Sequence, residues 1–260
     1  MGDINDHMIV SKENSDCNKY AGMTGLRELI FHDCHIENLS ALVKMPGLKV
    51  LGFARCTFGN ELLPALEGAP ALTRINLHNM CAAGLEELCG VKDLKRLYLH
   101  NVTDFKLENL TMYKNIFTLE IDNSGWYDSG IISRFVNLKK LYLYHGTIDS
   151  LDFLRMLPKL HKFMLQEPAG NEDGLIAISS MANLKEFIYP VKDLSVYKDC
   201  RKIEKIGIAS SGVHGYEALE GSNVDGFTIC GTERGNSRYH SKIVENIKKY
   251  IKYPYSCSYS

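Results

Sequence analysis

Apolar residues recur along this chain with a period of about 22 positions. The segments LRELIFHDCHIENLSALVKMPG, which starts at Leu26, and LKKLYLYHGTIDSLDFLRMLPK, which starts at Leu138, carry apolar residues at the same offsets. Their shared pattern is L-x-x-L-x-L/F, then a variable gap, then I-x-x-L-x-x-L-x-x-L/M. Self-similarity at a fixed period indicates a repeat architecture.

The same opening begins further units, whose first residues lie 19 to 24 positions apart. These first residues are Leu48, Leu72, Leu94, Ile116, Leu160, Leu184, Ile203 and Val224. Because the later offsets also agree from unit to unit, the chain is predicted to form a stack of similar structural units.

Each unit divides into a strand and a return segment. Near the end of the opening the pattern alternates with period two, so Leu141 and Leu143 are predicted to point into a core and Tyr142 and Tyr144 to point away. The remaining apolar residues lie three apart, which predicts a 3₁₀ or short helical turn. Because strands pack more closely than the bulkier return segments, the parallel sheet is expected on the concave side of the stack.

This pattern resembles the leucine-rich repeat family, in particular the short class of about 22 residues per unit found in internalin-like and phosphatase-regulator-like proteins. The resemblance covers Leu26 to Ile229. It implies an α/β fold, a right-handed solenoid with a curved parallel sheet on one side and 3₁₀ or short helical turns on the other. It also implies a scaffold that binds another protein.

One family feature is replaced throughout this chain. The family's usual asparagine eight residues into the unit is substituted by Cys34, Cys56, Met80, Val102, Ser124, Gly146 and Pro168. We therefore expect no continuous asparagine ladder at this position, and we interpret Cys34 and Cys56 as buried structural thiols. Trp126 is interpreted as a core residue, because other units place Ile36 and Ile148 there.

The ends of the stack need polar caps. We assign residues 1–25 to a degenerate repeat or cap, 26–235 to the solenoid, and 236–260 to a capping helix and tail. The helix is predicted from apolar residues at helical spacing, namely Tyr239, Ile243, Val244, Ile247, Tyr250 and Ile251. A basic helix that binds a membrane surface or a partner is the alternative. The tail YPYSCSYS is expected to fray.

Composition narrows the classes of function. The chain is 45% hydrophobic and 23% charged with a net charge of −1, so no global field favours nucleic acid or an anionic membrane. The first 20 residues lack the pattern of a secretory signal, and no window holds the roughly 18 apolar residues of a membrane span. We expect a cytoplasmic protein, and the eight cysteines form no CxxC pair or evident disulfide framework.

No motif for a cofactor or a catalytic nucleophile is present. GxxxxGK[ST], GxGxxG after a strand and GxSxG are all missing, so we expect neither a cofactor nor an enzyme. The acidic segment QEPAGNEDG is expected to form a loop on the rim of the stack.

The predicted register places three columns of side chains on the concave face. The first is basic, with Arg74, Arg96, Lys140 and Lys162; the second holds Tyr98, Glu120 and Tyr142; the third holds His78, His100, Asp122 and Tyr144. Tyrosine and arginine are enriched where binding energy concentrates. We predict that these residues bind a partner protein.

Three alternatives remain for the same residues. They can form an ordinary solvated face whose ion pairs contribute little. His78, His100 and Asp122 can ligate zinc with one position open, as in a metal-dependent hydrolase. The basic and tyrosine columns can bind a nucleic acid or another anionic ligand, although Glu120 and Asp122 would repel phosphates.

Overall fold

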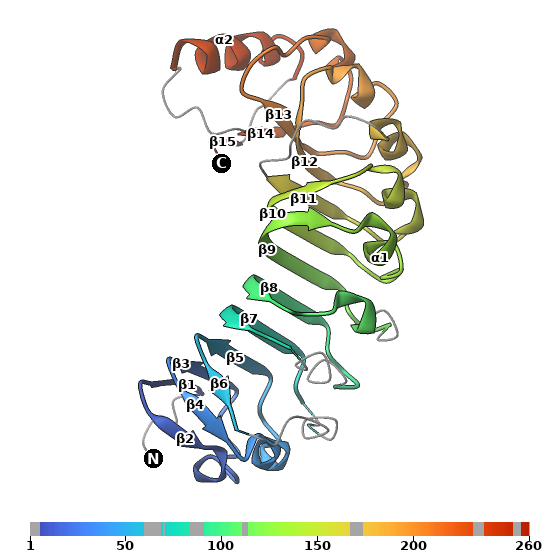
Figure 1. Ribbon diagram of the computed structural model, residues 1–260. Coiled ribbons are helices and arrows are strands. Elements are labelled where there is room, and N and C mark those ends of the chain that lie inside the picture. Colours follow the sequence, from blue (N-terminus) through green and yellow to red (C-terminus); the bar gives the residue numbers. More distant parts are fainter. Residues whose placement is uncertain are drawn as a thin grey trace. The chain divides into compact units, whose positions relative to one another are not determined.

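The computed structural model describes residues 6–59, 69, 71–83, 91–110, 114–166, 174–230, 237–251 and 256–259 (Figure 1). For 124–126, 237–239 and 256–259 the description covers the backbone alone. The chain divides into two compact units, Met1–Asn123 and Ser124–Ser260, and each is described by itself.

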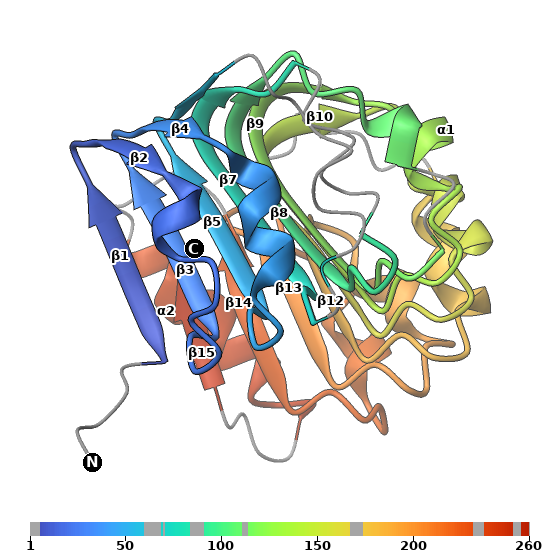
Figure 2. The same ribbon diagram turned by 90° about the horizontal axis from the view of Figure 1, so that it is seen from below.

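The first unit contains a parallel sheet whose strands follow chain order (Figure 2). Its strands are β1 (His7–Ser11), β3 (Glu28–His32), β5 (Val50–Ala54), β7 (Arg74–Cys81), β8 (Arg96–Thr103) and β9 (Thr118–Tyr127), the last of which continues past the division. A second parallel sheet is formed by β2 (Asn14–Asp16), β4 (His35–Glu37) and β6 (Thr57–Phe58). The 3₁₀ segments are η1 (Cys17–Lys19), η2 (Leu39–Lys44) and η4 (Leu107–Leu110).

In four repeats of the first unit, a residue with a left-handed backbone conformation turns the chain at the same position of the repeat. Asp33 separates β3 from β4 and Arg55 separates β5 from β6, with φ of 55° and 50°. Asn79 and Asn101 take the same conformation at the equivalent position, with φ of 51° and 49°. Asparagine and aspartate tolerate this region better than most residues. The Asn101 amide also donates to Asn79 Oδ1 at 2.8 Å, which links consecutive corners.

The second unit repeats the plan, with six further parallel strands among its described residues. These are β10 (Lys140–Ile148), β11 (Lys162–Gln166), β12 (Glu186–Val191), β13 (Lys205–Ala209), β14 (Gly226–Cys230) and β15 (Ser256–Tyr259). Its return segments are α1 (Ser129–Ile132), η5 (Asp152–Met156), η6 (Leu175–Ser180), η7 (Leu194–Tyr197) and η8 (Tyr216–Leu219), followed by helix α2 (Ser237–Ile247). The predicted alternation of parallel strands with 3₁₀ or short helical turns is confirmed.

In each unit the inward strand positions stack on one another and on the return segments. Phe31 of β3 stacks on Phe53 of β5, with ring centroids 5.7 Å apart. Phe163 of β11 stacks on Phe187 of β12 at 5.5 Å, and Phe153 of η5 packs edge-on against Phe163. All five rings are buried. A single repeat could not exclude water from these rings, so the core forms only when repeats stack on one another.

The two cysteines that replace the family asparagine are buried, as predicted. The Cys34 thiol donates to the carbonyl of His32 at 3.2 Å, and the Cys56 thiol donates to the carbonyl of Ala54 at 3.3 Å. Burial raises the pKa of the Cys56 thiol. Both cysteines therefore serve as small, weakly polar core residues.

Three asparagines that directly precede the first apolar residue of a repeat bond to the backbone of the repeat before it. The Asn115 amide donates to the carbonyl of Lys92 at 2.7 Å, and the Asn183 amide donates to the carbonyl of Pro158 at 2.8 Å. The Asn223 amide donates in the same way to the carbonyl of Arg201. Each bond joins one repeat to the preceding one.

The C-terminal tail corrects an expectation. Ser256–Tyr259 form β15 and pair in parallel with β14, from Gly226↔Ser256 to Ile229↔Tyr259, so the prediction of a frayed tail was wrong for these residues. Pairing satisfies backbone groups of β14 that would otherwise face solvent at a sheet edge.

The predicted apolar face of the C-terminal helix is present. Ile243 and Ile247 of α2 are buried, as is Ile251 beyond its end, and α2 packs against η8. None of the described helices is long and apolar enough to span a membrane. The Trp126 side chain, residues 167–173 of the acidic loop and residues 1–5 lie outside the described residues.

A backbone contact in the second unit gives a direct test of the packing. β12 bulges between Phe187 and Val191, so its backbone lies against Gly207 of β13. A Cβ at Gly207 would stand 2.3 Å from the backbone nitrogen of Tyr189. Gly207→Ala should therefore lower the free energy of unfolding by about 2–3 kcal/mol, measured by denaturant titration.

Gly59→Ala is the matched control, because a Cβ there would meet its nearest atom at an ordinary 3.6 Å. Equal stability of the Gly207 and Gly59 variants would show that the close approach of β12 to β13 is wrong.

Candidate binding face

The open face is defined here as the outward-pointing strand positions, opposite the side that packs against the return segments. In the first unit the predicted columns are in register: Arg74 pairs with Arg96, Tyr98 with Glu120, and His100 with both His78 and Asp122. The structure therefore brings all seven predicted residues of this unit together on β7, β8 and β9.

Arg74 is held in place by two neighbours on this face. Its guanidinium carbon lies 4.6 Å above the centre of the Tyr98 ring, and its Nε donates to Oδ1 of Asn76 at 3.0 Å. A guanidinium over an aromatic ring gains electrostatic attraction while it keeps its charge. Arg74 thus presents a positive charge from a fixed position, and it covers one face of the Tyr98 ring.

His100 lies between two carboxylates. Its Nε2 is 2.9 Å from Oε1 of Glu120, and its Nδ1 is 3.6 Å from Oδ2 of Asp122. Hydrogen bonding to Glu120 is the main cause that raises the pKa of His100, although partial burial opposes it. Only the imidazolium can donate from both nitrogens, so this arrangement favours the protonated ring.

His78 differs from its neighbour. Its ring centroid lies 5.9 Å from that of His100, and its pKa is lowered, chiefly by burial and then by the positive charge of His100. The pKa values of the two histidines are therefore shifted in opposite directions, so His100 is protonated more readily than His78.

His100, one of the three proposed zinc ligands, contacts two carboxylates. Both nitrogens of His100 face carboxylates, which leaves neither directed toward an ion shared with His78 and Asp122. Among the described residues, no group of three histidine, cysteine, aspartate or glutamate side chains is placed to hold a metal ion.

The second unit carries the remaining predicted residues, Lys140, Tyr142 and Tyr144 on β10 and Lys162 on β11. The Lys162 ammonium lies 2.7 Å from Oε2 of Glu186 and 5.4 Å from the centre of the Tyr142 ring. Glu186 also faces the Lys205 ammonium, at 3.8 Å. Glu186 therefore partly neutralises the basic column in this unit. The predicted site did not include Glu186.

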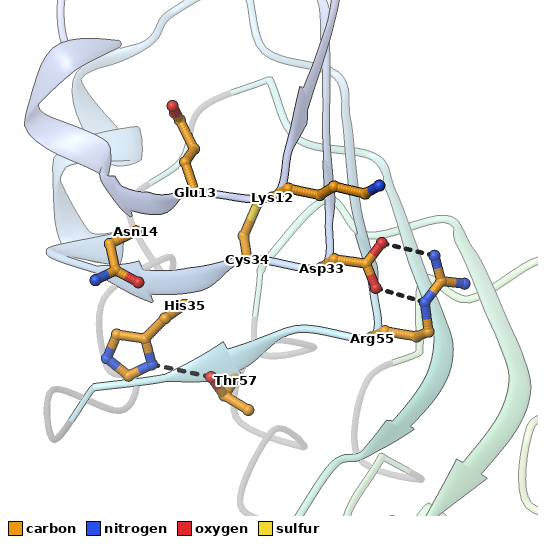
Figure 3. Close-up of a pocket in the computed structure, with 8 residues that line it drawn as sticks. All are labelled: Lys12, Glu13, Asn14, Asp33, Cys34, His35, Arg55 and Thr57. Atoms are coloured by element: carbon orange, nitrogen blue, oxygen red, sulfur yellow. Dashed lines mark hydrogen bonds and ion pairs between the residues drawn. The ribbon is translucent and has the colours of Figure 1, made fainter.

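Sequence reasoning also missed a pocket of about 650 Å³ in the first unit (Figure 3). Its lining residues are Lys12, Glu13, Asn14, Asp33, Cys34, His35, Arg55 and Thr57. Arg55 donates to both oxygens of Asp33, at 2.6 and 2.8 Å, and this pair lowers the pKa of Asp33. His35 Nδ1 lies 2.9 Å from Oγ1 of Thr57. The left-handed corners project Asp33 and Arg55 from consecutive units, a placement that no sequence motif reveals.

Comparison with known proteins identifies the fold. No protein-family model matches the chain, and no curated protein matches it. Among solved structures, the internalin InlF of Listeria monocytogenes has a TM-score of 0.61 and 15% identity over 93% of this chain and 71% of that one. Internalin C2 of the same species has a TM-score of 0.51 and 17% identity over 67% of this chain and 76% of that one. This chain has the leucine-rich repeat fold.

In the leucine-rich repeat fold, the backbone is the same from one repeat to the next, while the side chains at the outward-pointing strand positions can differ. Fold alone does not define a function, so any function must be argued from the residues that this chain places on the open face.

The His100 cluster predicts a dependence of stability on pH. A raised pKa in the folded state means that the stabilisation is fully present below the unfolded pKa, about 6.5, and is lost as the pH rises through the higher folded value. His100→Gln should therefore lower the free energy of unfolding more at pH 5.5 than at pH 8.5, by about 0.5–1 kcal/mol.

Denaturant titrations at both pH values measure this difference. His161→Gln, at an exposed histidine outside the cluster, is the control and should show no such dependence. If His100→Gln lowered the free energy of unfolding equally at both pH values, the proposed pairing of His100 with Glu120 and Asp122 would be contradicted.

Proposed function

We propose that this protein is a non-enzymatic binding module that presents the open faces of its sheets to a partner protein. The observation that carries the proposal is that polar and aromatic side chains on these faces are already fixed by their neighbours. Arg74 rests on Tyr98, His100 lies between two carboxylates, and Lys162 lies between Tyr142 and Glu186. A surface that is ordered before binding loses little conformational entropy when it binds.

The composition of the face supports this function. Tyr98, Arg96 and Tyr142 are of the residue types that dominate binding energy at protein interfaces, and all three are accessible to solvent. The backbone beneath Arg96 and Tyr98 is paired on both sides, because β8 lies between β7 and β9. A partner would therefore meet side chains whose positions are set by the sheet rather than by a loop.

Hydrolysis receives less support from the same residues. A general base needs a ring nitrogen that is free to accept a proton from water. His100 presents both nitrogens to carboxylates and favours its protonated form, so it is poorly suited to that role. We accordingly assign Glu120 and Asp122 to orienting His100 and to charge complementarity with a partner.

We further propose that the protein acts in a reducing compartment such as the cytoplasm. Six described cysteines, Cys17, Cys34, Cys56, Cys81, Cys200 and Cys230, are free thiols, which supports this assignment. Fractionation of cells that express the tagged full chain would contradict it if the protein were recovered outside the cell.

The binding function predicts which side chains a partner needs. The full chain and a Tyr98→Ala/Tyr142→Ala variant would be used to purify partners from a native lysate. Because a buried interface tyrosine typically contributes about 2 kcal/mol, the double variant should retain a specific partner at least about tenfold less than the unchanged protein.

Met156→Ala/Ile176→Ala is the matched control, since it truncates two exposed apolar side chains on return segments. This control should recover the partner normally, and all three proteins should share one melting curve. Recovery that is lost with the control but kept by the tyrosine variant would move the binding site to the return segments.

A further inference from the structure

Five basic residues line the amino ends of four successive strands in the first unit. They are Arg27, Lys49, Arg74, Lys95 and Arg96, called the cationic strip below. The strands β3, β5, β7 and β8 lie side by side in that order (Figure 2). Each of these strands therefore has at least one basic residue at its first position or directly before it, along the same edge of the sheet.

The backbone fixes the spacing of the strip. The amides of Lys49 and Val50 both donate to the carbonyl of Arg27, at 2.8 and 3.0 Å. The amides of Thr73 and Arg74 share the carbonyl of Lys49 in the same way. The same pattern joins Lys95 and Arg96 to the carbonyl of Thr73. The strip is thus part of a regular hydrogen-bonded ladder and does not depend on loop conformation.

The described residues provide no ion pair for the strip. Within the part of the chain that the structure describes, none of its five side chains forms an ion pair, although Asp93 and Glu28 are close in sequence. Glu28 is instead paired with His7, at 3.1 Å. Like charges on neighbouring strands repel one another, so the strip lowers stability unless an anion binds there.

The second compact unit differs in the ion pairing of basic residues at its strand starts. There, two of the basic residues at equivalent strand starts are paired: Lys185 lies 2.6 Å from Glu204, and Lys162 lies 2.7 Å from Glu186. The repeat can therefore accommodate acidic neighbours at these positions, and Glu28, which starts β3 as Glu186 starts β12, is paired with His7 and not with the strip. This difference indicates that the missing negative charge of the first unit comes from another molecule.

The spacing of the strip selects the shape of that molecule. Neighbouring strands lie about 4.8 Å apart, so four strands place charges at about 4.8, 9.6 and 14.4 Å from the first. An α-helix rises about 1.5 Å per residue, so positions i, i+3, i+7 and i+10 share one face and lie about 4.5, 10.5 and 15 Å along its axis. An extended segment repeats each face about every 6.7 Å and loses this match.

We propose that the cationic strip binds an acidic α-helix of a partner protein, laid across β3, β5, β7 and β8 with carboxylates at i, i+3, i+7 and i+10. This inference rests on the proposed protein-binding function and specifies the chemistry of the partner. A nucleic acid fits less well, because Arg74 covers a face of Tyr98 that a base would stack on. Glu120 and Asp122 on the same face would also repel phosphates.

The test uses two alanine-based peptides of about 20 residues, each shown to be helical by circular dichroism. One carries glutamates at i, i+3, i+7 and i+10, and the other carries the same glutamates distributed around the helix. The full chain should bind the first peptide at least about tenfold more tightly than the second, and raising salt from 50 to 300 mM should weaken binding by a similar factor.

Lys49→Glu/Lys95→Glu should reduce affinity for the one-faced peptide at least about tenfold, because it reverses two exposed charges of the strip. Lys198→Glu/Lys202→Glu is the matched control: it makes the same change in charge at two exposed lysines of the second unit and should stay within about twofold of the unchanged chain. Equal affinity for the two peptides, or equal loss in both variants, would overturn the proposal.

A single-stranded oligonucleotide serves as a competing probe. Tighter binding of the oligonucleotide than of the one-faced peptide, lost in the strip variant, would overturn the proposal in favour of a nucleic-acid site. The proposed function is judged separately with Tyr98→Ala/Tyr142→Ala. A partner that is lost with those tyrosines but retained by the strip variant would leave protein binding in place and reject the acidic helix.

Discussion

In-register pairing between consecutive repeat units is the constraint on which the rest of this structure depends. Each strand lies beside the same positions of the preceding unit, as Leu29 lies beside Leu51 and Leu51 beside Ile75. These side chains are completely buried, so a slip of one residue would expose the core and bury the open face. The register therefore turns a linear repeat into columns of equivalent residues, and each column acquires a chemical character of its own.

Those columns explain how neighbouring side chains come to fix one another. Residues that lie 22 positions apart in sequence, such as His78 and His100, become neighbours on adjacent strands, and their charges are coupled. The pairing of charges on the open face differs between the two compact units. Among the described residues of the first, Arg74 and Arg96 form no ion pair, whereas in the second Glu186 offsets Lys162. A face with fixed and partly uncompensated charges is suited to selecting a partner by electrostatic complementarity.

Much of this fold could be predicted from the sequence, because period-two alternation and fixed spacing determine which strand residues face inward. The pairing of Arg74 with Arg96 follows from that register alone. The bulge in β12 and the pairing of β15 could not be predicted, since both depend on contacts between distant segments. Side-chain partners were equally hidden: spacing placed His100 beside Asp122, but not its closer bond to Glu120. Arg27, Lys49 and Lys95 directly precede predicted strands and are basic in the sequence, but the three predicted columns did not include them.

Hydroxyl-radical footprinting of the full chain, with and without a bound partner, tests the central claim most directly. Side chains that contact the partner become protected from oxidation, and mass spectrometry locates them. Protection of Tyr98 and Tyr142, with unchanged oxidation of the exposed Met156 on its return segment, is the predicted result. Protection of Met156 with both tyrosines still fully reactive would contradict the account, because the partner would then bind the side of the repeats opposite the open face.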